Sequence, residues 1–220
     1  MQRREFSISA ATVAAASIGG SMALSPAAHA QGKPPQEGTD YLLLDKPAPT
    51  EAPAGKIEVV EFFWYSCPHC NHFEPQWEAW IKKAPKEAFI RRVPVSFRPD
   101  FEPQQRLFYT LEALGKVDEM QIKVFNAIHI ERQQLTTADQ ILAWIDKQPG
   151  INKAKFVETY NSFPIATKTR KATQLQDQYK VQGVPAIGVA GRFYTDGSQA
   201  GTMERALVVT EYLIAQARKK

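Results

Sequence analysis

The sequence predicts an α/β fold in which a helical segment interrupts a small sheet. Apolar, β-branched runs typical of strands occur early in the chain and return near its end; they lie at 41–44, 57–63, 89–97, 184–189 and 192–194. Between the third and fourth runs, apolar residues recur only at helical spacing. The predicted order is β-β-α-β, a helical segment, then β-β-α.

A chain of 220 residues and 24.7 kDa has room for one domain with an insertion. We expect a signal peptide at 1–30 and an extended arm at 31–56. A domain in two parts should follow, at 57–97 and 180–220, with an inserted helical subdomain at 98–179. The formal charge of +4 is too small and too dispersed to indicate nucleic-acid binding. The arm is too short to be a dimerisation domain, so we expect a monomer.

The first thirty residues have the three parts of a signal peptide. Arg3 and Arg4 supply the positive charge, residues 8–24 are uncharged and rich in alanine, and Ala28-His29-Ala30 fits the cleavage pattern. The stretch Arg3-Arg4-Glu5-Phe6 partly resembles a twin-arginine export motif, so both export routes stay open. Export places the cysteines in an oxidising compartment, where two thiols tend to form a disulfide.

The elements on either side of the cysteines have clear local signals. The nearly continuous apolarity of 57–63 indicates a central strand, and a helix is expected from Cys67 to about Lys83. Pro94 cannot donate to a ladder, so this part of the strand at 89–97 should lie at a sheet edge or at the end of the strand. Thr137-x-x-Gln140 predicts a capping box, and Thr202 is expected to cap the last helix.

Both cysteines lie in Cys67-Pro68-His69-Cys70, where the central strand gives way to a helix. A C-x-x-C in this position is the thioredoxin-like redox pattern. Free backbone N–H groups and the helix dipole stabilise an anion at a helix N-terminus, and Pro68 suits the first helical position. Protonated His69 would add positive charge. The pattern therefore predicts a stabilised Cys67 thiolate, and with it an oxidising disulfide.

Three other interpretations of the cysteine pair fit less well. A structural disulfide closing so short a loop would contribute only about 2 kcal/mol. A zinc site built on the two cysteines, His69 and His72 lacks the ligands from a distant segment that structural zinc usually has. Haem attachment requires C-x-x-C-H, and Asn71 follows Cys70. We therefore predict no metal and no organic cofactor.

Two distant stretches resemble the DsbA family of thiol:disulfide oxidoreductases. The first runs from Val59-Val60-Glu61-Phe62-Phe63 through the C-P-H-C motif to Phe73-Glu74, and the second is Gln182-Gly183-Val184-Pro185-Ala186. In that family, the downstream proline is cis and faces the disulfide. The resemblance covers essentially the whole mature chain and implies a thioredoxin-like fold with an inserted all-helical subdomain. The family is itself a standard example of a strongly acidic thiol.

The resemblance also implies roles by position. Cys67 resembles the exposed cysteine that a substrate thiolate attacks, and Cys70 resembles the more buried partner that leaves. His69 tunes the Cys67 thiolate. Val184 and Pro185 resemble the segment that pairs with an extended substrate peptide.

Two acids and an apolar patch complete the predicted site. Glu61, in an otherwise apolar strand, is a candidate acid–base group for the Cys70 proton. For Glu74, a similar role and a plain surface position paired with Arg92 both stay open. Apolar residues near the sulfurs are expected to bind unfolded polypeptide with little sequence preference; they are Trp64, Tyr65, Pro68, Val184 and Phe193.

The sequence thus predicts a periplasmic dithiol oxidase that donates the Cys67–Cys70 disulfide to reduced, newly exported proteins. The resemblance implies reoxidation by a membrane quinone-linked partner of the DsbB type. A periplasmic reductase or isomerase is the nearest alternative, because residues alone give only the direction of the redox potential. From a different class, an exported peptide-binding protein with an inert disulfide is also possible.

Overall fold

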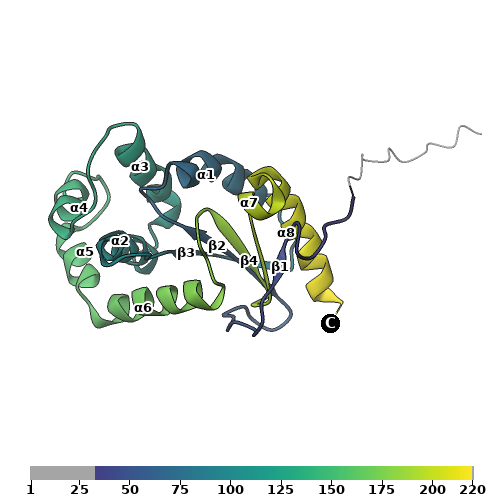
Figure 1. Cartoon of the computed structure of the whole chain (residues 1–220). Helices are drawn as coiled ribbons and strands as arrows, with labels where there is room; N and C mark the ends of the chain where they lie inside the picture. Colours follow the sequence, from purple (N-terminus) through teal and green to yellow (C-terminus); the bar gives the residue numbers. More distant parts are fainter. Residues whose placement is uncertain (1–32, 220) are drawn as a thin grey trace, which may run out of the picture. The chain divides into compact units, whose positions relative to one another are not determined.

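The computed structural model describes residues 33–219 (Figure 1). The predicted signal peptide at 1–30 lies outside the described residues. Within 33–219, none of the helices is both long enough and apolar enough to cross a bilayer.

A five-stranded mixed sheet, in the order β1-β5-β4-β2-β3, forms the centre of the fold. Its strands are β1 (Leu42–Leu43), β2 (Ile57–Phe63), β3 (Ala88–Pro94), β4 (Ala186–Val189) and β5 (Phe193–Asp196). β2 pairs in parallel with β3 and antiparallel with β4, and its last six residues are buried. The prediction of a central strand is confirmed, and Pro94 ends a strand at the edge of the sheet, as expected.

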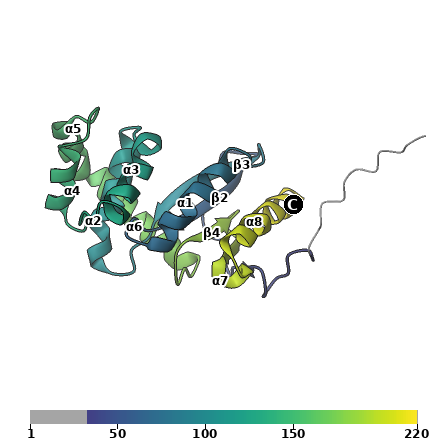
Figure 2. The ribbon, with the colours of Figure 1, turned by 90° about the horizontal axis from the view of Figure 1, so that it is seen from above.

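Helices cover both faces of this sheet (Figures 1 and 2). α1 (Pro68–Ile81) and α8 (Met203–Arg218) share one apolar cluster with Val59, Ile187 and Val189 of the sheet. On the opposite face, Tyr179 at the end of α6 packs against Phe62, with ring centroids 5.1 Å apart. A short helix that the sequence did not predict, α7 (Gly197–Ala200), precedes α8.

The chain between β3 and β4 forms helices joined by loops and contains no strand, which confirms the predicted helical insertion. It comprises η1 (Pro99–Phe101), α2 (Glu102–Ala113), α3 (Val117–His129), α4 (Ala138–Ile145), α5 (Lys153–Tyr160) and α6 (Phe163–Gln178). Thr137 forms the expected capping box with Gln140. The exact limits 31–56, 57–97, 98–179 and 180–220 stay a prediction.

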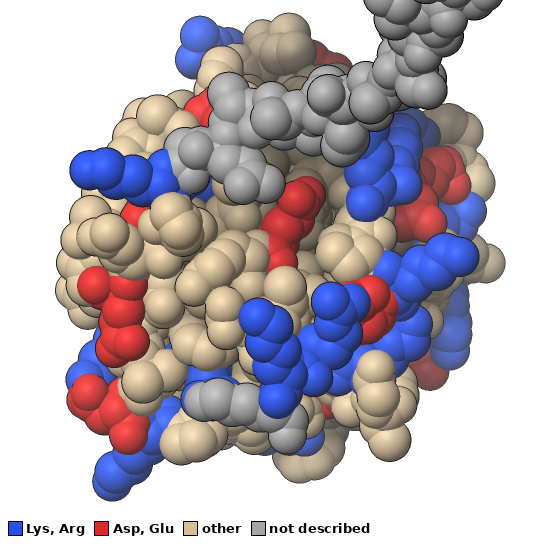
Figure 3. All heavy atoms as spheres, turned by 90° about the vertical axis from the view of Figure 1, so that its right-hand side faces the viewer, with Lys and Arg blue, Asp and Glu red and all other residues tan. Residues whose placement is uncertain are grey.

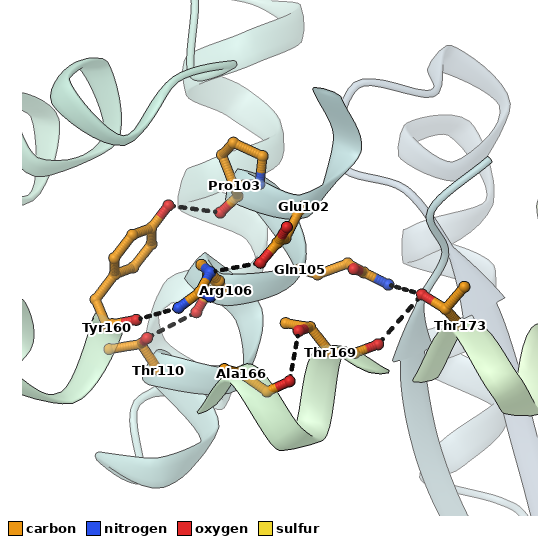
Figure 4. A network of polar contacts seen from close by, with 9 residues as sticks. All are labelled: Glu102, Pro103, Gln105, Arg106, Thr110, Tyr160, Ala166, Thr169 and Thr173. Atoms are coloured by element: carbon orange, nitrogen blue, oxygen red, sulfur yellow. Dashed lines mark hydrogen bonds and ion pairs between the residues drawn. The ribbon is translucent and has the colours of Figure 1, made fainter. Parts of the chain in front are cut away.

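Polar contacts fasten α2 to α5, and Gln105 of α2 donates to Thr173 of α6 at 3.4 Å (Figure 4). Arg106 donates to Glu102 at 2.8 Å and to the Tyr160 carbonyl at 3.0 Å. The Tyr160 hydroxyl donates to the Pro103 carbonyl at 3.2 Å, and Gln105 donates to the Pro94 carbonyl at 2.9 Å. The last bond joins the helical insertion to the end of β3, close to the sheet end that carries the cysteines.

Candidate redox site

The cysteine motif lies where the C-terminal end of β2 turns into α1. Cys67 is the residue that precedes the helix, with extended backbone angles and no side-chain cap, and Pro68 is the first helical residue. The Asn71 N–H donates to the Cys67 carbonyl at 3.1 Å and closes the first turn. The local sequence thus places the Cys67 sulfur beside the free N–H groups of the helix, as the motif predicts.

The two sulfurs have different surroundings. Cys70 is fully buried, whereas Cys67 keeps 7% of its surface exposed. The Cys67 Sγ donates to the carbonyl oxygen of Val184 at 3.4 Å, and the Val184–Pro185 peptide bond is cis. The distant Gln182–Ala186 stretch therefore lies directly against the Cys67 sulfur. Pro68 and His69 are both exposed beside it.

The surroundings move the two thiol pKa values in opposite directions. The Cys70 thiol donates to the Cys67 sulfur, and the N–H groups of Cys70 and His69 and the charge of His69 add to this effect. Together they lower the pKa of Cys67 to about 6, against the opposing effect of burial. Burial raises the pKa of Cys70 well above its usual value, and the interaction with Cys67 raises it further. Near neutral pH the reduced pair therefore holds one thiolate, on Cys67.

Three acids share one arginine in the core next to the motif. Arg92 lies 3.4 Å from Glu61, 2.9 Å from Glu74 and 2.6 Å from Glu78. Glu61 and Glu74 are 1% and 3% exposed. Burial raises the pKa of both carboxyl groups, and Arg92 opposes this only in part. Because one guanidinium cannot neutralise three carboxylates, the cluster retains a proton into the neutral range.

This cluster is electrostatically connected to the cysteines. The charge on Glu61 contributes to the raised pKa of Cys70. Glu74 pairs with Arg92, as the second expectation for this residue had it. It is buried, however, and is not the surface residue of that expectation.

The helical insertion holds the two residues that precede Cys67. The Tyr65 hydroxyl donates to Gln121 Oε1 at 2.7 Å, and His129 Nε2 lies 2.8 Å from the Tyr65 carbonyl, to which it must donate. Gln104 donates to Ser66 Oγ at 2.7 Å and to the Leu135 carbonyl at 2.9 Å. The sequence alone indicates no role for His129 or for either glutamine, although each glutamine interrupts an apolar helix face.

The predicted apolar patch needs correction. Tyr65 is fully buried, and Phe193 is 8% exposed and packs against Tyr41, so neither reaches the surface near the sulfurs. Trp64 is partly exposed and stacks on Phe101 at a centroid distance of 3.9 Å. Phe97, 40% exposed, packs against the Phe101 ring in a T-shaped arrangement, with ring centroids 6.1 Å apart. The aromatic surface beside the motif is therefore built by Trp64 with the segment that leads into α2.

Comparisons with known proteins agree with this geometry. Residues 88–208 match the family model of the DSBA-like thioredoxin domain, a range that contains Pro185 but begins after both cysteines. The chain is 39% identical to the thiol:disulfide interchange protein DsbA of Burkholderia cepacia, over 89% of each chain. It is 40% identical to the DsbA of Bordetella pertussis, over 94% of this chain and 96% of that one.

Solved structures show the same relationship. The crystal structure of Pseudomonas aeruginosa DsbA superposes with a TM-score of 0.78 at 39% identity, covering 83% of this chain and 94% of that chain. The resemblance therefore extends over the sheet, the inserted helices and the segment that carries the cysteines. By sequence and by fold, this chain belongs to the DsbA family of thiol:disulfide oxidoreductases and has a thioredoxin-like fold with a helical insertion.

Proposed function

We propose that Cys67 and Cys70 are the redox-active pair of this disulfide oxidoreductase and that their disulfide is donated to reduced polypeptides. The observation that carries the proposal is the asymmetry of the two thiols. The pKa of Cys67 is lowered to about 6 while that of buried Cys70 is raised. A thiolate at Cys67 stabilises the reduced form and makes Cys67 a good leaving group, so the disulfide is easily passed on.

The exchange proceeds in two steps. A substrate thiolate attacks the Cys67 sulfur of the oxidised pair and forms a bond between the substrate sulfur and Cys67. The Cys67–Cys70 bond breaks, and its electron pair leaves on Cys70. The second substrate thiolate then attacks the substrate sulfur of the mixed disulfide, and Cys67 leaves as a thiolate. The substrate gains a disulfide, and two electrons pass to the cysteine pair.

The proton that Cys70 requires has a nearby source. As Cys70 leaves, its raised pKa means that the sulfur takes up a proton near neutral pH. The Glu61 carboxyl has a raised pKa because of its burial and interacts with Cys70 through its charge. We assign Glu61 the exchange of this proton with Cys70, in either direction of the reaction. His69 acts on the other sulfur, by its charge beside Cys67.

Substrate binding is assigned to Val184, Pro185 and Pro68. The Val184 carbonyl contacts the Cys67 sulfur, and so backbone that pairs with this segment passes close to the reacting atoms. Pro68, the first residue of α1, is exposed next to Cys67 in the chain. An extended polypeptide suits such a site because main-chain pairing gives affinity without a demand for sequence.

We place this activity in the periplasm, after removal of the signal peptide at 1–30. The family resemblance supports reduced, unfolded polypeptides as substrates and a membrane quinone-linked protein of the DsbB type as reoxidant. The proposed reaction uses the cysteine sulfurs alone, without a metal or an organic cofactor, and the protein acts as a monomer.

The assignment of Cys67 is tested with a reduced, unfolded protein and glutathione disulfide as terminal oxidant. The wild-type protein should accelerate disulfide formation, whereas Cys67→Ser should fall to the uncatalysed rate. Wild-type rates in Cys67→Ser would show that the nucleophile is wrongly assigned.

A second variant tests the role of Cys70. Reduced Cys70→Ser, mixed with a disulfide-bonded peptide, should accumulate a mixed disulfide through Cys67, because the variant lacks the Cys70 thiol that would resolve it. Failure to trap this species, in a variant that folds and alkylates at Cys67, would contradict the assigned division of roles.

A further inference from the structure

Cations that are scattered in the sequence gather at one end of the molecule. Four segments contribute: the residue before β2, the end of α1, the loop before β3 and the end of α8. We call the set the basic pole; it consists of Lys56, Lys82, Lys83, Lys86, Arg218 and Lys219, all exposed. Figure 3, which looks onto the side with the end of α8, shows Lys and Arg side chains gathered over the lower and right parts of that face.

Two hydrogen bonds and one ion pair bring the four segments together. Lys56 Nζ donates to the Lys86 carbonyl at 2.6 Å. Arg218 pairs with Glu87 at 3.0 Å, which joins the end of α8 to the loop before β3. Trp80, two residues before Lys82, donates to Glu211 of α8 at 3.0 Å. The six cations therefore form one surface, although more than 160 positions separate the first from the last.

Few carboxylates balance this surface. Glu87 and Glu211 lie among the segments, so the basic pole keeps a charge of about +4, as large as the formal charge of the entire chain. The next carboxylates are already engaged: Glu51 and Glu58 pair with Arg91, and Glu78 pairs with Arg92. A net positive charge therefore remains on the basic pole.

The residue types and the open surface of the basic pole indicate which kind of partner it can bind. Five of its six cations are lysines, which are flexible point charges without the fixed fork that arginine offers to a discrete anion. A pocket of about 780 Å³ is lined by residues of β3, α1, α2, α3, α6 and the N-terminal arm, and by none of the six cations. A broad negative surface fits an open array of lysines, and anionic phospholipid headgroups attract each such cation near the bilayer.

We propose that the basic pole binds the surface of an anionic phospholipid membrane, loosely and in a salt-dependent way. Lys56 lies just before the N-terminal end of β2 and the cysteine motif follows its C-terminal end, so the seven-residue strand separates them by roughly 20 Å. A protein bound through the basic pole keeps Cys67 turned away from the lipid. This inference is independent of the proposed redox function.

The test is co-sedimentation of the mature protein with vesicles of equal parts phosphatidylglycerol and phosphatidylcholine, with pure phosphatidylcholine vesicles as reference. At about 10 mM salt the wild-type protein should bind only the anionic vesicles and be released at about 0.5 M salt. The variant Lys82→Glu/Lys83→Glu/Lys86→Glu should bind at least about tenfold more weakly. The matched variant Lys147→Glu/Lys153→Glu/Lys155→Glu changes the net charge equally on the helical insertion and should bind like wild type.

Each other outcome overturns the proposal. Absence of wild-type binding to anionic vesicles at low salt would exclude a membrane as the partner. An equal loss of vesicle binding in both triple variants would show that binding depends on net charge and not on the basic pole. Tighter binding to soluble polyglutamate than to the vesicles would indicate an acidic protein partner instead. Cys67 should alkylate at the same rate in bound and free protein, and protection on binding would contradict the orientation. Disulfide-forming activity, measured without vesicles, should be the same in all three proteins and confirms that the variants fold.

Discussion

Two cysteines three positions apart acquire opposite chemistry from a few neighbouring atoms. Cys67 precedes the first turn of α1, where N–H groups and the Cys70 thiol stabilise its negative charge. Cys70, one turn further on, is fully buried and has a raised pKa. The direction of exchange follows from this difference, because the sulfur that is attacked is also the better leaving group.

The buried acids make a prediction about stability at the same scale. Burial raises the folded-state pKa of Glu61 above its unfolded value of about 4.3, so folding binds a proton and stability falls as pH rises above that value. Glu61→Gln removes this loss and leaves Arg92 paired with Glu74 and Glu78. We expect the variant to be more stable than wild type at pH 7 by more than about 1 kcal/mol, with the difference vanishing near pH 4.

Urea unfolding of the oxidised proteins at a series of pH values measures this difference. Glu78→Gln, at the exposed end of the same cluster, is the matched control and should show a smaller effect. The opposite result would be a stability of Glu61→Gln that falls below that of wild type as pH rises from 4 to 7. It would mean that the Glu61 carboxylate is charged and stabilises the fold.

At the scale of elements, the junction between β2 and α1 depends on the inserted helices. Gln121 and His129 of α3 bind Tyr65, and Gln104 of α2 binds Ser66. The insertion thus fixes the backbone that leads into Cys67.

His129→Leu tests this connection. The change leaves the Tyr65 carbonyl without its donor and should cost about 1–3 kcal/mol in urea unfolding. Because the Tyr65 carbonyl lies two residues before Cys67, the pH profile of Cys67 alkylation should also shift. His72→Leu, at an exposed position of α1, should change stability by less than about 0.5 kcal/mol and leave the profile unaltered. Equal behaviour of the two variants would show that the bond is dispensable.

Local signals predicted local structure well in this chain. The capping box at Thr137, the N-cap at Thr202 and the central strand β2 depend on residues within a few positions, and all are present. The contacts that the sequence did not reveal are long-range. Gln121 and Tyr65 are 56 positions apart, and His129 and Tyr65 are 64 apart. A glutamine or histidine on a helix face does not disclose which distant carbonyl or hydroxyl it meets.

The same limit explains the misjudged exposures. Tyr65 and Phe193 border loops in the sequence, and only the folded chain shows that α3 covers the first and that Tyr41 of the N-terminal arm packs against the second. The gathering of the basic pole from four segments is a further property that exists only in the folded molecule.

For the whole molecule, the Cys67 pKa makes the reduced form gain stability relative to the oxidised form as pH rises. The pKa is about 6 when folded and about 8.5 when unfolded, so the thiolate contribution is complete near pH 8.5 and is lost as pH falls through 6. After allowance for solvent screening, the difference between the two forms should grow by roughly 1–3 kcal/mol over that interval. Parallel unfolding curves at pH 5 and pH 8 measure it, and a constant difference would show that Cys67 has an ordinary pKa.

The redox potential of the Cys67–Cys70 pair, measured by equilibration with glutathione at pH 7, tests the central claim most directly. The family provides the best-known oxidising example, about −120 mV, so the structure predicts the direction and not the magnitude. A stabilised Cys67 thiolate and a readily donated disulfide require a potential on the oxidising side of about −180 mV. A value near the −270 mV or so of thioredoxin would contradict the account and identify the protein as a reductase.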